Sequence, residues 1–467
     1  MIITQDIRKW AKEYEGEKFH SILADPPYAL VSITKRFGRT SLGDDTYTSD
    51  KVRNGSDSYS RLIATGFMGQ AWDNEVAFDP ELWYDLGQHL YPGAYLLAFG
   101  GTRTFHRLAC AIEDAGFEIR DTMMWIYGSG FPKSHNIGRA IDKQAGAKRE
   151  VVGIQKHPTS DDRTGDKSPY QAENSHLNGE FEITAPATDM AKTWDGYGTA
   201  LKPAFEPIIV ARKPVEGTIA NNCVTYGSGA LNIDGCRVEG ESIPINKLEE
   251  WSGFGQKERP DYVQEMNNKG RWPANLITDG SEEVLEGFPN TKSGKMGEWN
   301  TRHTDGSPNG IYGRFDINAP LHETIGDSGS AARFFYCAKV SPGEREAGCE
   351  YMEEVLTGMS NGAQSHGEGY DKGQDIGFNR VVAKRNNHPT LKPIALTEYL
   401  ARLILPPVEY APRRILIPFS GAGSEMIGAH NAGWEEIVGI ELSEEYTKIA
   451  EARLKHWASL PRQMTLE

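Results

Sequence analysis

The chain has 467 residues, of which 38% are hydrophobic and 25% charged, and this composition excludes a chain that is disordered throughout. At roughly 100 to 200 residues per domain, the length fits two or three domains, or one large domain with insertions. With 50 Lys and Arg against 65 Asp and Glu, the net charge of −15 excludes a protein held on nucleic acid by bulk charge alone, but not one with a local basic cleft.

The N-terminal region predicts two strands and a helix. MIIT is typical of a short strand, DIRKWAKEY of a helix, and the apolar run FHSILA of a buried strand. The buried strand stops at Asp25-Pro26-Pro27-Tyr28, because proline has no N–H to give to a β-ladder. Asp25 is therefore expected where a sheet gives way to a loop.

Two further regions alternate helices with buried strands. Between about residues 80 and 215 we expect a helix in ELWYDLGQHL, a strand in AYLLAFG, a helix closed by Gly116, and strands in TMMWIYG and EPIIVARKP. In residues 389–467 the order is helix (PIALTEYLARLI), strand (RRILIPF), helix (SEMIGAHNAG), strand (EEIVGIEL) and a closing helix with Ser443 as its N-cap. This alternation predicts an α/β fold with a mostly parallel sheet.

Three polar, Gly-rich stretches separate these regions: residues 31–75, 146–200 and 216–388. Loops this long in a compact enzyme are usually functional or form a recognition element. The opening residues lack a secretory signal pattern, and no apolar run approaches the ~18 residues of a membrane span. The five cysteines are scattered without a CxxC pair. We therefore expect a cytoplasmic protein with no membrane association, no disulfide framework and no metal site.

A glycine-rich segment, Phe419-Ser420-Gly421-Ala422-Gly423, follows a predicted strand and precedes a helix. In that context a glycine loop lets the backbone approach a nucleotide-like ligand closely. Glu441 ends the next strand, 22 positions after Phe419, which is the spacing of an acid that holds ribose hydroxyls. No phosphate-binding GxxxxGK[ST] loop is present. S-adenosylmethionine fits this pair better than a nucleoside triphosphate or a dinucleotide, because it needs a ribose clamp but no phosphate cradle.

Asp25-Pro26-Pro27-Tyr28 is suited to activating an amino group on an aromatic base. Such an amine is a poor nucleophile, because its lone pair is delocalised into the ring. The Asp25 carboxylate and the Pro26 carbonyl can accept its two hydrogens, and the two prolines hold these acceptors in place beforehand. Tyr28 offers a face on which an extruded base can stack. The alternative is a strand-terminating turn without chemistry.

With these motifs the chain resembles the amino-methylating DNA methyltransferases in the permuted β-group order, and especially their phage and prophage members. The resemblance implies a Rossmann-like S-adenosylmethionine-dependent methyltransferase fold with a large inserted recognition region. It assigns catalysis to Asp25, Pro26, Pro27 and Tyr28. It assigns cofactor binding to Asp6 near the adenine, Thr390 and Lys392 near the methionyl part, the loop residues Phe419, Ser420, Gly421, Ala422 and Gly423, and Glu441 at the ribose.

The resemblance also divides the chain. Residues 1–215 are expected to form the N-terminal part of the catalytic domain, with substrate loops at 31–75 and 146–200. Residues 216–388 are the expected target-recognition region, and 389–467 the C-terminal part with the cofactor loop. One position departs from the family pattern: Ile417 stands where the family usually has an Asp before Pro-Phe, so a carboxylate expected near the methyl donor is missing.

The expected reaction is methylation of N6 of adenine in DNA, because Asp before Pro-Pro-Tyr is commoner in adenine enzymes and Ser in cytosine enzymes. A base inside a duplex would have to be flipped out to reach such a pocket. N4 methylation of cytosine, a noncatalytic DNA- or cofactor-binding protein of the same fold, and methylation of RNA or of a protein glutamine remain alternatives. The recognition sequence, a homodimeric state and a restriction partner are left open.

Overall fold

The computed structural model describes residues 1–28, 75–128, 130, 134–156, 175–176, 180–238, 243–248, 262–267, 269–292, 328–338, 342–358 and 381–460. Most of the expected substrate loop 31–75, with its lysines and arginines, lies outside these residues, as do Lys257 and Arg259 of the expected recognition region.

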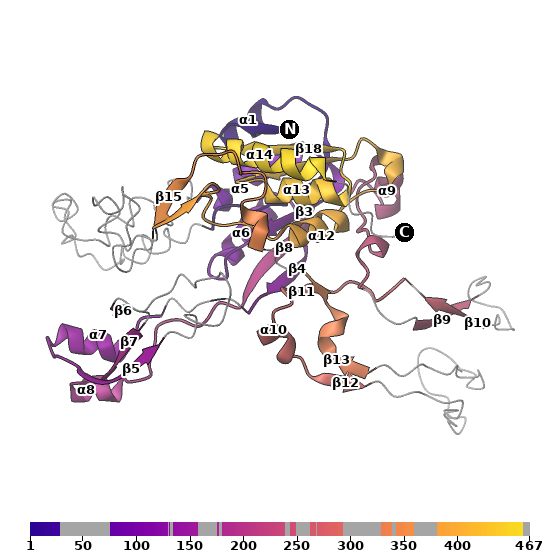
Figure 1. Cartoon of the computed structure of the whole chain (residues 1–467). Coiled ribbons are helices and arrows are strands. Elements are labelled where there is room, and N and C mark those ends of the chain that lie inside the picture. The colour runs from indigo at the N-terminus through magenta and orange to yellow at the C-terminus, as the bar shows by residue number, and fades with distance from the viewer. Residues whose placement is uncertain are drawn as a thin grey trace, which may run out of the picture.

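A nine-stranded sheet forms the centre of the molecule (Figure 1). Its strands lie in the order β1 (Ile2–Thr4), β18 (Glu436–Glu441), β17 (Arg414–Pro418), β2 (Phe19–Ala24), β3 (Leu90–Phe99), β8 (Phe205–Arg212), β4 (Glu118–Ile126), β11 (Leu276–Thr278) and β14 (Tyr336–Cys337). All neighbouring pairs are parallel except those that β8 makes with β3 and β4. The predicted mostly parallel α/β sheet is confirmed.

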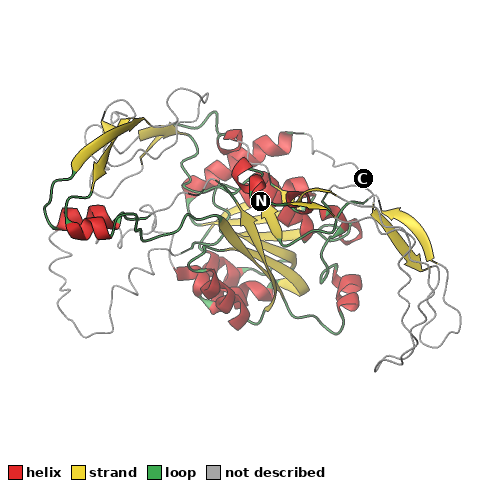
Figure 2. Cartoon of the chain, turned by 90° about the horizontal axis from the view of Figure 1, so that it is seen from below, coloured by secondary structure: helices red, strands yellow, loops and turns green. Residues whose placement is uncertain are grey.

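Helices cover both faces of this sheet (Figure 2). One apolar cluster joins alternate strand residues such as Ile22, Leu96 and Leu416 to α1 (Ile7–Glu13), α5 (Pro80–Gln88) and α6 (Phe105–Asp114). The other joins the intervening residues, such as Leu23 and Leu97, to α12 (Ile394–Leu403) and α13 (Ser424–Ala432). Because successive strand residues point to opposite faces, a strand covered on both faces is apolar throughout, as these runs are.

The helix ends follow the sequence signals. Gly116 after α6 and Gly433 after α13 have φ of +93° and +106°, which favours glycine. The Ser443 side chain accepts a hydrogen bond from Tyr446 N at the start of α14 (Glu444–Ser459).

The remaining helical segments are α7 (Ile137–Gln144), α8 (Asp189–Thr193), α9 (Ile219–Tyr226), α10 (Glu282–Glu286), and the 3-10 turns Glu75–Phe78, Asp234–Cys236, Ala331–Phe334, Pro342–Arg345 and Val408–Tyr410. In the described part of the chain no helix is long and apolar enough to cross a membrane.

The polar stretch 146–200 contains regular structure where a long loop was expected. β5 (Glu150–Lys156), β7 (Glu180–Ala185) and β6 (Ser175–His176) form a small antiparallel sheet beside α7 and α8, away from the central sheet (Figure 1). The buried Asp142 ties this unit together, since its carboxylate pairs with Arg149 at 2.7 Å and accepts from Ala187 N and Thr188 N. The stretch was expected to be a loop because Gly and polar residues dominate it, so the two short strands β5 and β7 were not recognised in the sequence.

The stretch 216–388, by contrast, contributes two strands to the central sheet. Its β11 and β14 extend that sheet beyond β4, with Ile277 paired to Trp125 and to Tyr336. Three antiparallel pairs lie outside it: β9 (Ile243–Leu248) with β10 (Tyr262–Asn267), β12 (Asn290–Lys292) with β13 (Ser328–Ser330), and β15 (Val355–Gly358) with β16 (Val381–Lys384). Strands of two or three residues carry no periodicity, so the sequence did not reveal that this region contributes to the sheet. Its role in target recognition stays a prediction.

Candidate active site

The two key motifs meet where the chain reverses its direction across the sheet. β17 and β2 are neighbours, with Leu416 paired to Ile22. From β17 the chain continues to β18 on one side, and from β2 it continues to β3 on the other. In open parallel sheets, ligands bind outside the carboxyl ends of the strands at such a switch point. The glycine loop leaves β17 and Asp25 leaves β2 at this edge.

Four polar side chains, the Asp25 cluster, converge here: Asp25, Tyr28, Glu206 and Lys392. The Lys392 ammonium lies 2.8 Å from Asp25 Oδ2 and 3.4 Å from Glu206 Oε2, and it donates to the Tyr28 hydroxyl at 3.1 Å. The Tyr28 hydroxyl lies 3.1 Å from both Asp25 Oδ1 and Glu206 Oε2. Because a hydroxyl has one proton, it donates to one of these two carboxylates at a time.

The cluster fixes the charges of its members. The Lys392 side chain is only 5% exposed, and burial opposes its charge. The nearby carboxylates of Asp25 and Glu206 outweigh that effect and hold the pKa of Lys392 well above its ordinary value. Burial, followed by the Asp25 carboxylate, raises the pKa of Tyr28 well above its ordinary value. Tyr28 is therefore a neutral hydrogen-bonding group, and Lys392 is a cation.

Asp25 and Pro26 still have oxygen lone pairs that can accept hydrogen bonds from a ligand. A carboxylate has about four lone-pair sites, and Lys392 and Tyr28 occupy one on each Asp25 oxygen. The Pro26 carbonyl accepts no hydrogen bond from any residue in the described ranges. An amino group placed at this edge could therefore donate one hydrogen to Asp25 and the other to Pro26.

The glycine loop contacts Glu441 through a backbone hydrogen bond. The Glu441 carboxylate accepts from Gly421 N through Oε2 and from Ser443 N through Oε1, both at 2.8 Å. Burial raises the pKa of Glu441, although these two bonds act in the opposite direction. Phe419, Gly421 and Gly423 all have positive φ, and a Cβ on Gly421 would lie 2.9 Å from His388 Nε2. This close approach requires glycine at 421.

The other predicted cofactor residues occupy different environments. Asp6 caps α1 just after β1, where Gln5 N bonds the Glu441 carbonyl, so Asp6 lies at the same sheet edge. Ser420 and Ala422 are buried as whole residues. Thr390 is exposed, and its carbonyl oxygen accepts from the His388 ring. Burial lowers the pKa of His388 to about 4, so this ring is neutral at pH 7.

Three residues in or beside the site were not anticipated. Glu206 opens the antiparallel β8, opposite Trp125, which brings its carboxylate to the edge where the parallel strands end. Arg453 of α14 is buried and donates to the Ala422 carbonyl at 2.5 Å and to Ser424 Oγ at 3.2 Å, which secures the loop. Glu425 lies in the first turn of α13. The acid that opens EPIIVARKP and the acid that follows the glycine loop were the available signals, but nothing local shows that the first reaches Tyr28 or that the second is buried.

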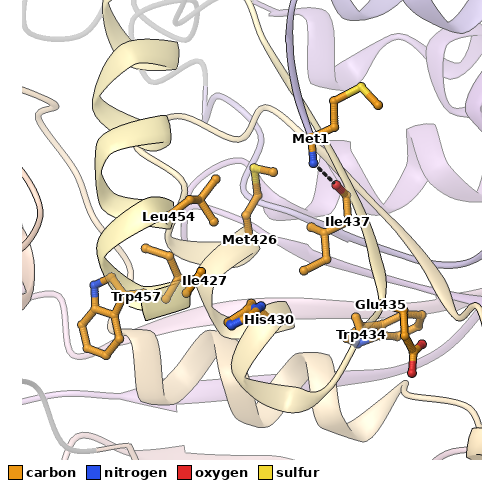
Figure 3. Close-up of a pocket in the computed structure, with 10 residues that line it drawn as sticks. Met1, Met426, Ile427, His430, Trp434, Glu435, Ile437, Leu454 and Trp457 are labelled. Atoms are coloured by element: carbon orange, nitrogen blue, oxygen red, sulfur yellow. Dashed lines mark hydrogen bonds between the residues drawn. The ribbon is translucent and has the colours of Figure 1, made fainter. Parts of the chain in front are cut away.

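A separate cavity of about 360 Å³ lies near the opposite end of β18 (Figure 3). It is lined by Met426, Trp434 and Trp457, and by Met1, whose ammonium group donates to the Ile437 carbonyl at 2.7 Å. Glu441 and the glycine loop are at the other end of this strand, so the cavity is distinct from the Asp25 site.

Among the described residues no group of three or more His, Cys, Asp or Glu could hold a metal ion.

Comparisons with known proteins point to one family. The family model described as DNA methylase matches residues 19–452. The Type II methyltransferase M.HindIII of Haemophilus influenzae is 22% identical over 239 residues, which is 47% of this chain and 61% of that protein, so the match spans about three fifths of the relative.

Solved structures with similarity include the M1.HpyAVI–SAM complex, at 12% identity over 97% of this chain and 98% of that chain, with a TM-score of 0.33. The PvuII DNA methyltransferase (cytosine-N4-specific) has 10% identity over 99% of this chain and 87% of that chain, with a TM-score of 0.39.

Proposed function

The chain belongs to the DNA methylase family, and from this premise we propose that it transfers a methyl group from S-adenosylmethionine to N6 of adenine in DNA. One observation carries the proposal: the Asp-Pro-Pro-Tyr turn and the glycine loop with its acid leave adjacent strands at the switch point of the sheet. A methyl donor held over the loop would thereby lie beside acceptors suited to an amine.

The chain's residues supply alignment and electrostatics. The donor, when bound, provides a methyl group on a sulfonium that leaves as a neutral thioether, so no covalent intermediate on the protein is required. Asp25 and the Pro26 carbonyl accept the two amine hydrogens and free the nitrogen lone pair for attack. As the new N–C bond forms, the nitrogen becomes cationic and the negative Asp25 stabilises it. The excess proton then leaves through this carboxylate to water.

Lys392 takes a role in this proposal beyond the one the sequence indicated. The resemblance places it near the methionyl part of the donor, and its contacts place it on Asp25, Tyr28 and Glu206. Lys392 therefore orients the Asp25 carboxylate and sets the position of Tyr28. A donor carboxylate would share the same ammonium.

Target selection in this proposal rests with residues 216–388, but several basic residues there are already paired within the chain. Arg237 bonds Asp234 at 2.8 Å and lies over the Trp272 ring at 5.3 Å. Arg271 lies over the Phe334 ring at 5.3 Å, and Arg385 pairs with Glu354 at 2.8 Å. Contacts to DNA phosphates or bases would have to compete with these partners.

The product should be N6-methyladenine. The same two acceptors serve the amine of either base, so the choice depends on Asp rather than Ser at position 25 and on the larger stacking area that a purine offers Tyr28. Mass spectrometry of nucleosides from mixed-sequence DNA treated with the protein and S-adenosylmethionine measures the product. N4-methylcytosine without N6-methyladenine would overturn the choice of base, and no methylated nucleoside at all would overturn the function.

Glu441→Ala should weaken cofactor binding first. Loss of a charge-assisted bond to the ribose hydroxyls costs about 1.5–3 kcal/mol, which is roughly a 10- to 100-fold rise in Kd. The variant also releases Gly421 N, and both effects act in the same direction. Calorimetry with S-adenosylmethionine measures the change. Glu436→Gln, at the far end of the same strand, is the matched control. An unchanged affinity in Glu441→Ala would place the ribose clamp elsewhere.

A further inference from the structure

Glu425 is a buried carboxylate that its own backbone N–H bonds, but that no other described residue pairs. It lies in the first turn of α13, two residues after Gly423, and the residue is 4% exposed. Across the described residues, no other residue makes a hydrogen bond or an ion pair with its carboxylate. Burying an unpaired carboxylate is costly, and groups kept in this condition are concentrated at functional sites.

The surroundings of Glu425 place it beside the Asp25 cluster. After burial, the charged groups that act on it are the Asp25 carboxylate, the Lys392 ammonium and the Arg453 guanidinium. The Arg453 guanidinium is engaged by the Ala422 carbonyl, Ser424 Oγ and the Glu344 carbonyl. Lys392 is engaged by Asp25, Tyr28 and Glu206. Neither Lys392 nor Arg453 forms a hydrogen bond or ion pair with Glu425. The Glu425 carboxylate could therefore bind a cationic group of a ligand.

Ile417 cannot supply an acid at this edge of the sheet. The Ile417 side chain is fully buried in the apolar cluster that includes Leu23 and Leu97. Within the glycine loop and the first turn of α13, the only acid is Glu425. A carboxylate next to this loop therefore comes from the helix that follows the loop and not from β17.

We propose that Glu425 binds the α-ammonium group of the methionyl part of S-adenosylmethionine. This inference rests on the proposed function, because it assumes that the donor lies over the glycine loop. It explains why a buried carboxylate has no charged partner among the described residues, because the ligand supplies the ammonium group that pairs with it.

Glu425→Gln tests this assignment, because it keeps the shape of the side chain and removes the charge. We expect the Kd for S-adenosylmethionine to rise about 10- to 100-fold, as for loss of a charge-assisted bond. The Kd for 5′-methylthioadenosine, which has the nucleoside and the thioether but no amino acid, should change less than about twofold. Titration calorimetry of the full chain measures both. Glu398→Gln, in an ion pair of α12 with Arg402, is the matched control and should change neither.

The dependence on pH gives a second readout. Burial and the Asp25 carboxylate raise the pKa of Glu425 to about 7, against the opposing effects of Lys392 and Arg453. Ammonium binding requires the ionised form, so the affinity of the wild type should rise roughly fivefold between pH 6 and 7. This rise should be absent in Glu425→Gln. His388, with a pKa lowered to about 4, is already neutral in this range and does not contribute.

Stability separates this role from a structural one. Because the pKa of Glu425 is raised on folding, its contribution to stability is present at low pH and is lost as pH rises through about 7. Glu425→Gln should therefore melt no lower than the wild type at pH 8.

Equal affinity of wild type and variant for S-adenosylmethionine, or an equal loss for both ligands, would overturn the assignment and leave the proposed function standing. A wild type that binds no S-adenosylmethionine would overturn both.

Discussion

Asp25→Ala is expected to lower the rate of methyl transfer by about 10²–10³ or more, because it removes one of two acceptors that act chiefly on the cationic nitrogen of the transition state. The second acceptor, the Pro26 carbonyl, belongs to the backbone and stays. Single-turnover methylation of DNA at saturating S-adenosylmethionine measures the chemical step. Affinity for the cofactor should change much less, since Glu441 and the glycine loop are untouched.

Asp25 is also the nearest charged partner of Lys392, so a variant that changes only the Asp25 charge is needed as well. Asp25→Ala leaves a buried cation with Glu206 alone, and part of any loss could come from a disturbed cluster. Asp25→Asn keeps the shape and an acceptor oxygen but removes the charge, and it should lose nearly as much rate while remaining folded. Asp189→Asn, in an exposed pair with Lys192, is the control for removal of a carboxylate. A rate near that of the wild type in Asp25→Asn would show that the Asp25 charge is not used.

Lys392→Met should destabilise the protein by about 3 kcal/mol and also abolish methyl transfer. Removing one partner of a buried charge pair costs about 3–5 kcal/mol, because the remaining charge is left uncompensated. The lower end applies here, since the Asp25 and Glu206 side chains are 19% and 23% exposed and water can reach them in part. Unfolding in urea measures the free energy of unfolding.

A double variant identifies the cause of this loss. Glu206→Gln added to Lys392→Met removes one of the two uncompensated carboxylates, so it should recover part of the lost stability. Lys192→Met, which breaks an exposed pair, should leave the stability unchanged. If Lys392→Met unfolds at the same urea concentration as the wild type, Lys392 does not compensate the cluster.

The sequence by itself determined the central helices, most strands of the sheet and the two motifs. Hydrophobic periodicity and capping residues act within a few positions, so signals such as FHSILA, Gly433 and Ser443 are local and were matched by β2, the end of α13 and the start of α14. The spacing from the glycine loop to Glu441 is set by one helix and one strand. It predicted a shared site for the loop and Glu441, and in the structure Gly421 N donates to the Glu441 carboxylate because that unit folds on itself.

Only the tertiary structure decided which distant residues complete the site. Lys392 reaches Asp25 across 367 positions, and Glu206 reaches Tyr28 across 178, because strand order brings β8 and the segment before α12 to the end of β2. The burial of Glu425 likewise depends on what packs over the start of α13. Strand order and burial arise from contacts across the whole sheet, so neither leaves a local pattern in the chain. The proposed reacting groups were thus predicted from the sequence, whereas the charged side chains next to them became visible only in the fold.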